Sequence, residues 1–182
     1  DPSELRDIGE FEDAIWHEYS RKDEGLCLPW KKTWNDVKLR PGETSIWAGV
    51  NGHGKSTLLS FAVAGMGATG VKCCVASMEY RAELWMMRMN RQAAGVATPS
   101  EQFSRQVTRA MAGNVKAFAV SGAAKAERIL EVFRYARRRY QIELFLIDNL
   151  TKCGFADDDY PGQKAFVEAV SDFARDEQTH VA

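Results

Sequence analysis

The sequence predicts an α/β fold in which a mostly parallel sheet is covered by helices on both faces. Short apolar runs alternate along the chain with longer segments in which apolar residues recur at helical spacing. Several of the runs are apolar throughout, which is typical of strands buried on both faces. The chain of 182 residues is also long enough to bury the core of one such domain.

The elements follow in order from the N-terminus. Ile8, Phe11 and Ile15 recur at helical spacing behind the capping residue Ser3, so a helix is expected over residues 3–20. Residues 21–43 contain Leu28-Pro29-Trp30 and Pro41-Gly42, which are turn signals, and no regular element is expected there.

Strands and helices are expected to alternate in the rest of the chain. Strands are predicted where apolar and β-branched residues cluster, and helices where apolar residues recur every three or four positions. Gly67 and Gly70 are expected to end one helix, and Thr98-Pro99 to begin another. The predicted strands are residues 44–49, 71–78, 115–120 and 142–147, and the predicted helices are residues 55–66, 81–94, 99–112, 124–139 and 164–178.

Charge and cysteine content restrict the class of protein. Residues 1–25 carry a net charge of −6 and the remaining residues +5, which suits either nucleic-acid contact by a basic body or simply a solvated acidic helix. No apolar run reaches the roughly 18 to 20 residues of a membrane span, so no membrane partner is expected. The four cysteines form no CxxC pattern and are expected to be reduced thiols of a cytosolic compartment.

The glycine-rich turn after the first predicted strand carries the most chemical information. It reads Gly49-Val50-Asn51-Gly52-His53-Gly54-Lys55-Ser56 and fits the phosphate-binding pattern G-x-x-x-x-G-K-[ST]. Its backbone N–H groups and the following helix N-terminus suit phosphates, while Lys55 would reach the β- and γ-phosphates and Ser56 would bind Mg²⁺. The expected nucleotide-binding residues are Gly49, Asn51, Gly52, His53, Gly54, Lys55, Ser56 and Thr57.

A second pattern lies about 90 residues downstream, where four apolar residues precede Asp148. A buried strand of this kind, a Walker B pattern, brings its aspartate to the carboxyl edge of the sheet, where open α/β sheets bind ligands. There Asp148 can hold Mg²⁺ through water, so Ser56 and Asp148 are the expected metal residues. The two patterns together predict a nucleoside triphosphatase that uses ATP, or another nucleoside triphosphate, with Mg²⁺.

The catalytic base has two candidate positions. In many ATPases of this type a glutamate directly follows the Walker B aspartate, but here that position is Asn149. Glu79 is the alternative, because it ends the second predicted strand at the same edge of the sheet. Its other interpretation is an ordinary acid at a helix start, beside Arg81. The expected catalytic residues are Glu79, Lys55 and Asp148.

These motifs together resemble the RecA-type motor of DnaB-like replicative helicases, which phage helicase-primases and the Twinkle-type mitochondrial helicase share. The resemblance rests on the turn at Pro41-Gly42-Glu43, the Walker A strand and turn, the strand-end Glu79, and Asp148-Asn149-Leu150. It covers roughly residues 40–182, and the region around Leu28-Pro29-Trp30 looks closest to the Twinkle-like branch.

The resemblance implies a RecA-like P-loop NTPase fold. The expected domains are an N-terminal helix and linker over residues 1–40 and a RecA-like ATPase domain over residues 41–182. It also implies an ATP-dependent DNA helicase that works in replication as a hexameric ring around single-stranded DNA, with a primase or a loader as a further partner. Glu79 would polarise the attacking water. The expected compartment is the cytoplasm of a bacterium, for a bacterial or phage-encoded protein, with the mitochondrion as the alternative.

Two elements of the family are expected beyond Ala182, namely the polar sensor and the arginine finger. We therefore expect this chain alone to bind Mg-ATP or ADP but to hydrolyse ATP slowly. The candidate DNA contacts are Lys152, in the loop after the Walker B strand, and Lys164, at the start of the next predicted helix. Residues 157–159 are all aspartate and would repel phosphates; they would instead cap that helix or pair with a neighbouring subunit.

Other interpretations stay open. The chain could be a RecA-type ATPase that is not a helicase, such as a recombinase-like or KaiC-like protein, or a nucleotide-gated ring scaffold with little turnover. Arg137-Arg138-Arg139 ends a predicted helix at the sheet edge opposite the nucleotide, which favours a solvated or interface role over nucleic-acid binding.

Overall fold

The structure, a computed structural model, describes residues 5–20, 25–50, 52–119, 126–156 and 158–182. Short 3-10 turns lie at Ile8–Phe11, Lys31–Thr33 and Leu150–Lys152. The α-helices are α1 (Glu12–Ser20), α2 (Lys55–Ala68), α3 (Ala82–Ala94), α4 (Glu101–Met111), α5 (Ala126–Tyr140) and α6 (Tyr160–Asp176). The strands are β1 (Leu26–Cys27), β2 (Lys38–Leu39), β3 (Cys73–Ser77), β4 (Val115–Ala117), β5 (Leu144–Asp148) and β6 (His180–Val181).

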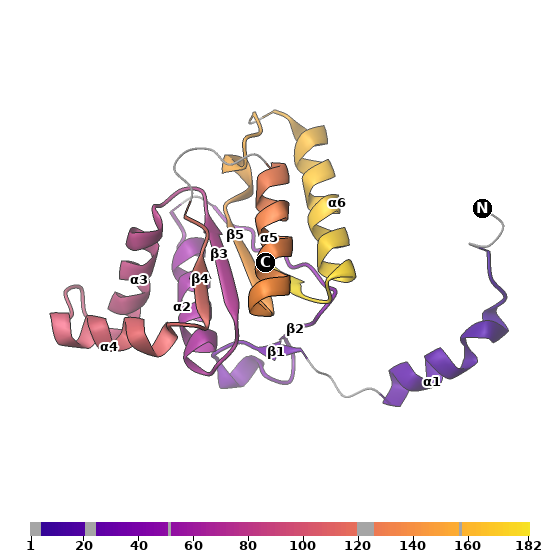
Figure 1. The fold of residues 1–182 in the computed structure, drawn as a ribbon, viewed down its shortest axis with the longest axis horizontal. Coiled ribbons are helices and arrows are strands. Elements are labelled where there is room, and N and C mark those ends of the chain that lie inside the picture. The colour runs from indigo at the N-terminus through magenta and orange to yellow at the C-terminus, as the bar shows by residue number, and fades with distance from the viewer. Residues whose placement is uncertain (1–4, 21–24, 51, 120–125, 157) are drawn as a thin grey trace.

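The main sheet confirms the predicted α/β class. In the described residues its four strands are all parallel and follow the order β4-β3-β5-β6. The central pair, β3 and β5, runs in register from Cys73 opposite Leu144 to Ser77 opposite Asp148. Figure 1 shows α2 and α3 on one side of this sheet and α5 and α6 on the other.

The core has two halves, one on each face of the sheet, because successive strand residues point to opposite sides. On β5, Phe145 packs with Phe133 of α5 and Phe173 of α6, with ring centroids 4.4 and 5.2 Å from that of Phe145. Leu144 and Leu146 of the same strand instead join the cluster around α2 and α3. Burial on both faces explains why the run that forms β5 is apolar throughout.

The predicted strand over residues 44–49 is wrong beyond its first residue. Thr44 forms an isolated parallel bridge with Val181, and the Ser45 N–H donates to the Val181 carbonyl at 2.9 Å. Strand β6 ends at Val181, and no strand among the described residues pairs with residues 46–49. The segment runs extended toward the glycine-rich turn without a ladder.

Helix α6 begins earlier than predicted, at Tyr160 rather than at residue 164. The Asp159 side chain accepts a hydrogen bond from the Gly162 N–H at 2.9 Å, and Pro161 occupies the first turn. Both features favour a helix start. Lys164 therefore lies inside the helix, and Asp159 is the capping residue that the sequence suggested among its three aspartates.

Helix α2 continues through Gly67 to Ala68, although the sequence predicted that Gly67 would end it. A Cβ added at Gly67 would lie 2.5 Å from Cγ2 of Val115, and one at Gly65 would lie 2.5 Å from Cβ of Pro29. The two glycines therefore allow α2 to approach β4 and the segment before β2 closely.

The segment expected to be irregular also contains regular structure. Strands β1 and β2 pair antiparallel, with Leu26 opposite Leu39. Leu28 and Leu39 are buried in the same cluster as residues of α2 and α3. This small hairpin is thus attached to the body of the fold, and the expected division at residue 40 stays a prediction.

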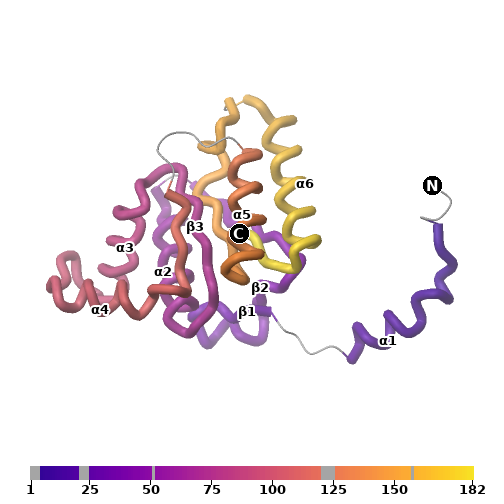
Figure 2. Tube along the Cα trace, viewed as in Figure 1, coloured from indigo at the N-terminus to yellow at the C-terminus, as the bar shows by residue number. Residues whose placement is uncertain are grey.

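The N-terminal helix is shorter than predicted. A 3-10 turn capped by Asp7 precedes α1, while Ser3, the expected cap, lies outside the described residues. No residue of α1 is buried, and Phe11, Ile15 and Trp16 are exposed. Figure 2 shows α1 apart from the rest of the chain.

Candidate functional site

The glycine-rich turn forms where residues 45–50 reach the N-terminus of α2. Gly52 and Gly54 have φ angles of 82° and 83°, a left-handed conformation that costs glycine little and other residues more. Gly54 directly precedes Lys55, the first residue of α2. The backbone thus turns sharply into a helix whose free N–H groups can bind an anion.

Lys55 folds back over this turn. Its Nζ donates to the carbonyl oxygens of Gly49 at 2.6 Å and Val50 at 3.2 Å. The ammonium group is therefore held over the turn by neutral acceptors, which an anionic phosphate oxygen would outcompete. Gly52, His53 and Thr57 are exposed around it, and Asn51 lies outside the described residues.

Ser56, on α2, and Asp148, at the end of β5, are in contact at the carboxyl edge of the sheet. The Ser56 hydroxyl donates to Oδ1 of Asp148 at 2.9 Å, although 92 residues separate them. Asp148 is the last residue of β5 and only 4% exposed, and its Oδ2 is buried without a hydrogen-bond partner. A buried carboxylate oxygen without a partner is costly unless a ligand satisfies it.

This pair fits a magnesium ion. Mg²⁺ prefers oxygen ligands and usually keeps several waters, so it is typically bound by one or two protein groups plus substrate phosphates. The Ser56 hydroxyl and the free Oδ2 of Asp148 supply two oxygens beside the glycine-rich turn. No cluster of three or more acidic, histidine or cysteine ligands exists in the described residues, so an all-protein metal cage is not available there.

Glu79 reaches the same edge of the sheet from the neighbouring strand. Ser77 of β3 lies opposite Asp148, and the Met78 N–H donates to the Asp148 carbonyl at 2.7 Å. Glu79 follows and is exposed, and its Oε2 accepts a hydrogen bond from Nδ2 of Asn149 at 3.3 Å. The two positions weighed for the base, 79 and 149, are therefore in direct contact.

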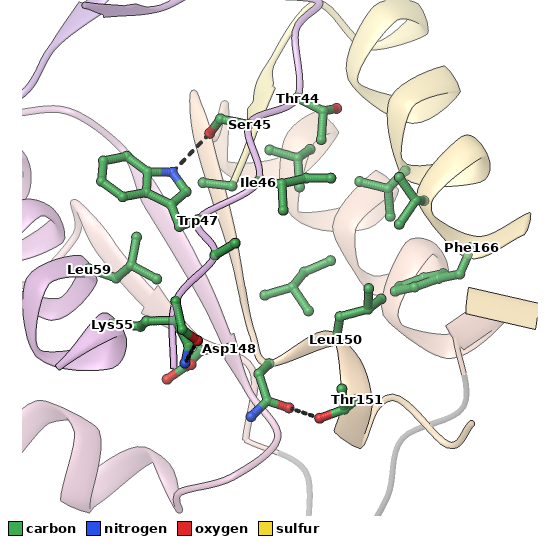
Figure 3. A pocket seen from close by; sticks show the side chains of 18 residues that line it. Thr44, Ser45, Ile46, Trp47, Lys55, Leu59, Asp148, Leu150, Thr151 and Phe166 are labelled. Atoms are coloured by element: carbon green, nitrogen blue, oxygen red, sulfur yellow. Dashed lines mark hydrogen bonds between the residues drawn. The ribbon is translucent and has the colours of Figure 1, made fainter. Parts of the chain in front are cut away.

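A pocket of about 380 Å³ opens beside these residues (Figure 3). It occupies the gap between residues 45–49 and the end of β5, where no strand separates them. Lys55 and Asp148 lie together at one end, and Phe166 of α6 lies at the other. The remaining walls are mostly apolar and include Ile46, Leu59, Ile147, Leu150, Val167 and Val170. The positive charge that could bind a phosphate is therefore at the end that holds Lys55.

The candidate DNA residues lie outside the phosphate-binding turn. Lys152 is exposed in the 3-10 turn after β5. Lys164 is exposed on α6 and pairs with Glu168 at 3.6 Å. Neither lysine lines the pocket, and DNA contact by either stays a prediction.

The arginine run at the end of α5 has a structural role in part. Arg137 reaches the end of α6 and the start of β5, and Arg138 forms an ion pair with Glu177 at 2.8 Å. These bonds join the C-terminal ends of the two helices that cover one face of the sheet. Arg137 donates to the carbonyl oxygens of Ile142 and Glu177, each at 2.9 Å, and of Gln178 at 3.2 Å.

Sequence reasoning missed two polar contacts that hold the N-terminal part of α2 against α3. Gln92 of α3 donates to the Thr57 carbonyl at 2.7 Å, and its Oε1 accepts from the Ser60 hydroxyl at 3.0 Å. A lone glutamine on an amphipathic helix gives no signal of such a contact, because the pairing depends on how α3 packs against α2.

His180 of β6 holds the segment that leads into the turn. Its Nε2 lies 2.9 Å from the Ser45 hydroxyl and its Nδ1 2.9 Å from the Arg40 carbonyl, while Nε1 of Trp47 donates to the same hydroxyl at 3.0 Å. Burial lowers the pKa of His180, an effect opposed by the Arg40 carbonyl and the charge of Glu43. The neutral imidazole therefore fits this network.

The cysteines supply no reactive group to the site. Cys73, Cys74 and Cys153 are buried and Cys27 is half-buried, all as free thiols. Burial raises the pKa of each of the three buried thiols to about 12. They are therefore protonated and unreactive at neutral pH, in line with the expectation of reduced, mostly buried thiols.

Comparison with known proteins supports the fold. No protein-family model matches the sequence, and no curated protein matches it. The structure is similar to that of a DnaB-like replicative helicase, determined with its interactions with primase, with a TM-score of 0.71 and 14% sequence identity over 97% of this chain. The chain shares the fold of that helicase. It spans about half, 47%, of the helicase chain.

The shared fold agrees with the predicted RecA-like architecture, since a parallel sheet with helices on both faces is common to both. At 14% identity the similarity concerns the backbone arrangement and assigns no role to a residue. In the described residues no helix is long and apolar enough to span a lipid bilayer.

Proposed function

We propose that this chain is the nucleoside-triphosphate-hydrolysing motor of a DnaB-like replicative helicase. The observation that carries the proposal is the contact between Ser56 and Asp148, with one Asp148 oxygen buried and free beside a glycine-rich helix start. A structural turn would have no need for a buried carboxylate with an unpaired oxygen. A bound metal–nucleotide complex would satisfy that oxygen.

Each residue has a separate task in this proposal. The turn and the N-terminus of α2 bind the phosphates, and Lys55 exchanges its loop carbonyls for phosphate oxygens. Ser56 and Asp148 hold Mg²⁺, which neutralises charge on the phosphates when it is bound. Glu79, at the same edge, accepts a hydrogen bond from the attacking water and so orients it.

The helicase part of the proposal extends beyond the nucleotide site. The fold similarity to a DnaB-like helicase supports a homo-oligomeric, hexameric ring that moves along single-stranded DNA. Lys152 is the better candidate for DNA contact, because it is exposed on the turn that directly follows the Walker B strand. A primase or a loading protein is a further proposed partner.

The test begins with calorimetric titration of ADP and ATP into the chain, with and without Mg²⁺. We expect Mg²⁺ to strengthen binding, and we expect Ser56→Ala and Asp148→Asn to remove that gain. Asp172→Asn on the exposed face of α6 serves as the matched control and should keep it. A chain that binds neither nucleotide would overturn the proposal.

Hydrolysis and strand separation, measured on protein that extends past Ala182 to the expected arginine finger, then distinguish the motor from its alternatives. Stimulation of ATP hydrolysis by single-stranded DNA of about tenfold or more, together with unwinding of a forked duplex, supports the helicase. Hydrolysis without unwinding by the assembled ring indicates a RecA-type ATPase of another kind. Tight binding with negligible turnover indicates a nucleotide-gated scaffold.

A further inference from the structure

The residue after the Walker B aspartate has a side chain with two partners. Nδ2 of Asn149 donates to Oε2 of Glu79 at 3.3 Å, and Oδ1 of Asn149 accepts from the Thr151 hydroxyl at 2.8 Å. The three side chains thus form a continuous chain of hydrogen bonds. It begins in the 3-10 turn Leu150–Lys152 and ends on the candidate base (Figure 3 shows its first link).

The two partners together fix the orientation of the Asn149 amide: the Glu79 carboxylate only accepts and so selects the NH₂ group, and the Thr151 hydroxyl holds the oxygen. An amide can rotate to present either its NH₂ group or its oxygen, and the two orientations have opposite hydrogen-bonding character. With the oxygen held by the threonine hydroxyl, the NH₂ group is the end that faces Glu79. The opposite orientation would place an amide oxygen against a carboxylate.

The backbone of Asn149 is fixed at the same point. Its carbonyl oxygen accepts from the Lys152 N–H at 3.2 Å and lies 3.5 Å from Sγ of the buried Cys153. Asn149 therefore belongs both to the end of β5 and to the turn that follows. A shift of that turn moves the Thr151 hydroxyl and with it the amide that faces Glu79.

We propose that Asn149 and Thr151 are positioning residues that orient Glu79 for hydrolysis and link its orientation to the turn at residues 150–152. This rests on the proposed function, in which Glu79 orients the attacking water. The Asn149 amide occupies Oε2 of Glu79 and leaves Oε1 to accept a hydrogen bond from that water. Asn149 lines the pocket, and in this scheme it acts on hydrolysis through Glu79.

The test compares Asn149→Leu and Thr151→Val, which keep side-chain size and remove the hydrogen bonds. Single-turnover hydrolysis of ATP is measured with the chain in excess, and its concentration dependence separates the maximal rate from the half-saturation point. We expect Asn149→Leu to lower the maximal rate about tenfold, because misplacement of a catalytic group is costly, and to leave half-saturation unchanged. Thr151→Val should lower the rate about three- to tenfold, the range for one lost hydrogen bond. Thr98→Val, an exposed threonine between α3 and α4, is the matched control and should change neither.

Double variants test the relay, that is, whether Thr151 acts through Asn149 and Asn149 acts through Glu79. Because Thr151 acts through Asn149, Thr151→Val should have no further effect in the Asn149→Leu background. Because both act through Glu79, neither should lower the rate further once Glu79→Gln is present. Additive effects would overturn the relay and indicate independent structural roles.

A binding measurement keeps the proposal testable whatever the absolute rate. ADP with Mg²⁺ and aluminium fluoride mimics the transition state, and its affinity can be compared with that of Mg-ADP alone. We expect Asn149→Leu to weaken the fluoride complex about tenfold and leave Mg-ADP unchanged. Equal loss of both affinities would overturn the relay, since it would indicate damage to the phosphate-binding turn. If Glu79→Gln weakens the fluoride complex and Asn149→Leu does not, the relay alone fails; if Glu79→Gln has no effect, the proposed role of Glu79 fails.

Discussion

Lys55 is held by the turn that it is expected to serve. Its ammonium group is bound by two carbonyl oxygens, so the side chain is already positioned when a nucleotide arrives and little conformational entropy remains to be lost. An exposed, unrestrained lysine would contribute less. This arrangement makes the lysine a sensitive residue for testing the phosphate site.

We predict that Lys55→Ala weakens ATP binding by about 3 kcal/mol, roughly a hundredfold, because a charge-assisted contact is lost. Calorimetric titration measures the change. Lys31→Ala, which removes an exposed lysine outside the site, is the control and should bind ATP like the parent chain. Unchanged affinity in Lys55→Ala would exclude the turn as the phosphate site.

His180 gives the chain a pH dependence of defined sign. Burial lowers its pKa from the usual 6.5, while the nearby Arg40 carbonyl and Glu43 oppose that effect. The unfolded chain therefore binds the proton more readily than the native one. The stability that neutral His180 contributes is present above the unfolded pKa and is lost as pH falls through the lower native pKa.

We predict that the free energy of unfolding decreases below about pH 6.5, with His180 contributing at most about 1.4 kcal/mol per pH unit. Urea denaturation at a series of pH values between 7.5 and 5 measures the slope. His180→Gln keeps polar contacts to Ser45 and Arg40 but does not titrate, so its slope should be smaller. Identical slopes would show that another group is responsible.

At the scale of elements, the periodicity of the sequence predicted whether a helix or a strand forms. It was less successful in predicting the residues at which the elements begin and end. Helical spacing of apolar residues located α3 closely, and a continuous apolar run located β5, because the burial of each is determined along the element itself. The start of α6 depends on a bond between Asp159 and Gly162, and the strand character of residues 45–49 depends on a neighbouring strand. The pattern of apolar residues within a segment identifies neither the capping bond nor the neighbouring strand.

The candidate site divides in the same way. Residue type and spacing pointed to Ser56, Asp148 and Glu79 at one sheet edge, since parallel strands end together. The contacts of Asn149 with Thr151 and of Gln92 with Thr57 were not foreseen. They depend on the orientation of single amide groups, which leaves no trace in sequence spacing.

The close approach of α2 to β4 can be tested with a pair of substitutions. A Cβ at position 67 would lie 2.5 Å from Cγ2 of Val115, so Gly67→Ala should destabilise the fold by about 1–3 kcal/mol. In the Val115→Ala background that atom is absent, and the same change should be neutral or stabilising, because alanine favours helix more than glycine. Urea denaturation of the four proteins measures both effects. Equal destabilisation in both backgrounds would mean that Val115 is not the obstacle.

Helix α1 and the 3-10 turn before it carry exposed apolar side chains. Phe11, Ile15 and Trp16 are 37%, 45% and 72% exposed. In a ring, such a helix could cover this surface by docking on an adjacent subunit. We predict that deletion of residues 1–20 lowers the oligomeric state and leaves the thermal midpoint of the body unchanged.

Light scattering combined with thermal denaturation measures both properties. Ile15→Glu, which places a charge on the apolar side of α1, should reproduce the loss of assembly. His17→Glu changes a neighbouring exposed residue in the same way and is the control. Intact rings after the deletion would exclude a docking role for α1.

At the scale of the whole molecule, the proposed function couples ligand binding to folding, because the candidate site is assembled from segments far apart in the sequence. Ser56 is on α2, which belongs to one half of the core, and Asp148 is on β5, which contributes side chains to both halves. Under the proposed function, Mg-ADP would bind only when β5 is in place between the two halves. It should therefore stabilise the complete fold rather than one part.

We predict that Mg-ADP at 100 times its dissociation constant raises the free energy of unfolding by about 2.7 kcal/mol, as linkage requires. Circular dichroism and tryptophan fluorescence should report the same upward shift of the urea midpoint. Asp148→Asn at the same ligand concentration should shift less, since its affinity is lower. Different midpoints for the two probes would indicate that the halves unfold separately.

The wide sequence separation within the parallel sheet also affects how the protein is made. Strand β3 cannot pair with β5 until about 70 further residues have left the ribosome. Ser56 is synthesised 92 residues before Asp148, a delay of roughly 5–18 s at typical translation rates. Until β5 is made, the edge of β3 that pairs with it lacks its partner, whereas β4, at residues 115–117, can cover the other edge earlier. The nascent chain is thus most open to aggregation, and most dependent on a chaperone, between synthesis of α3 and synthesis of β5.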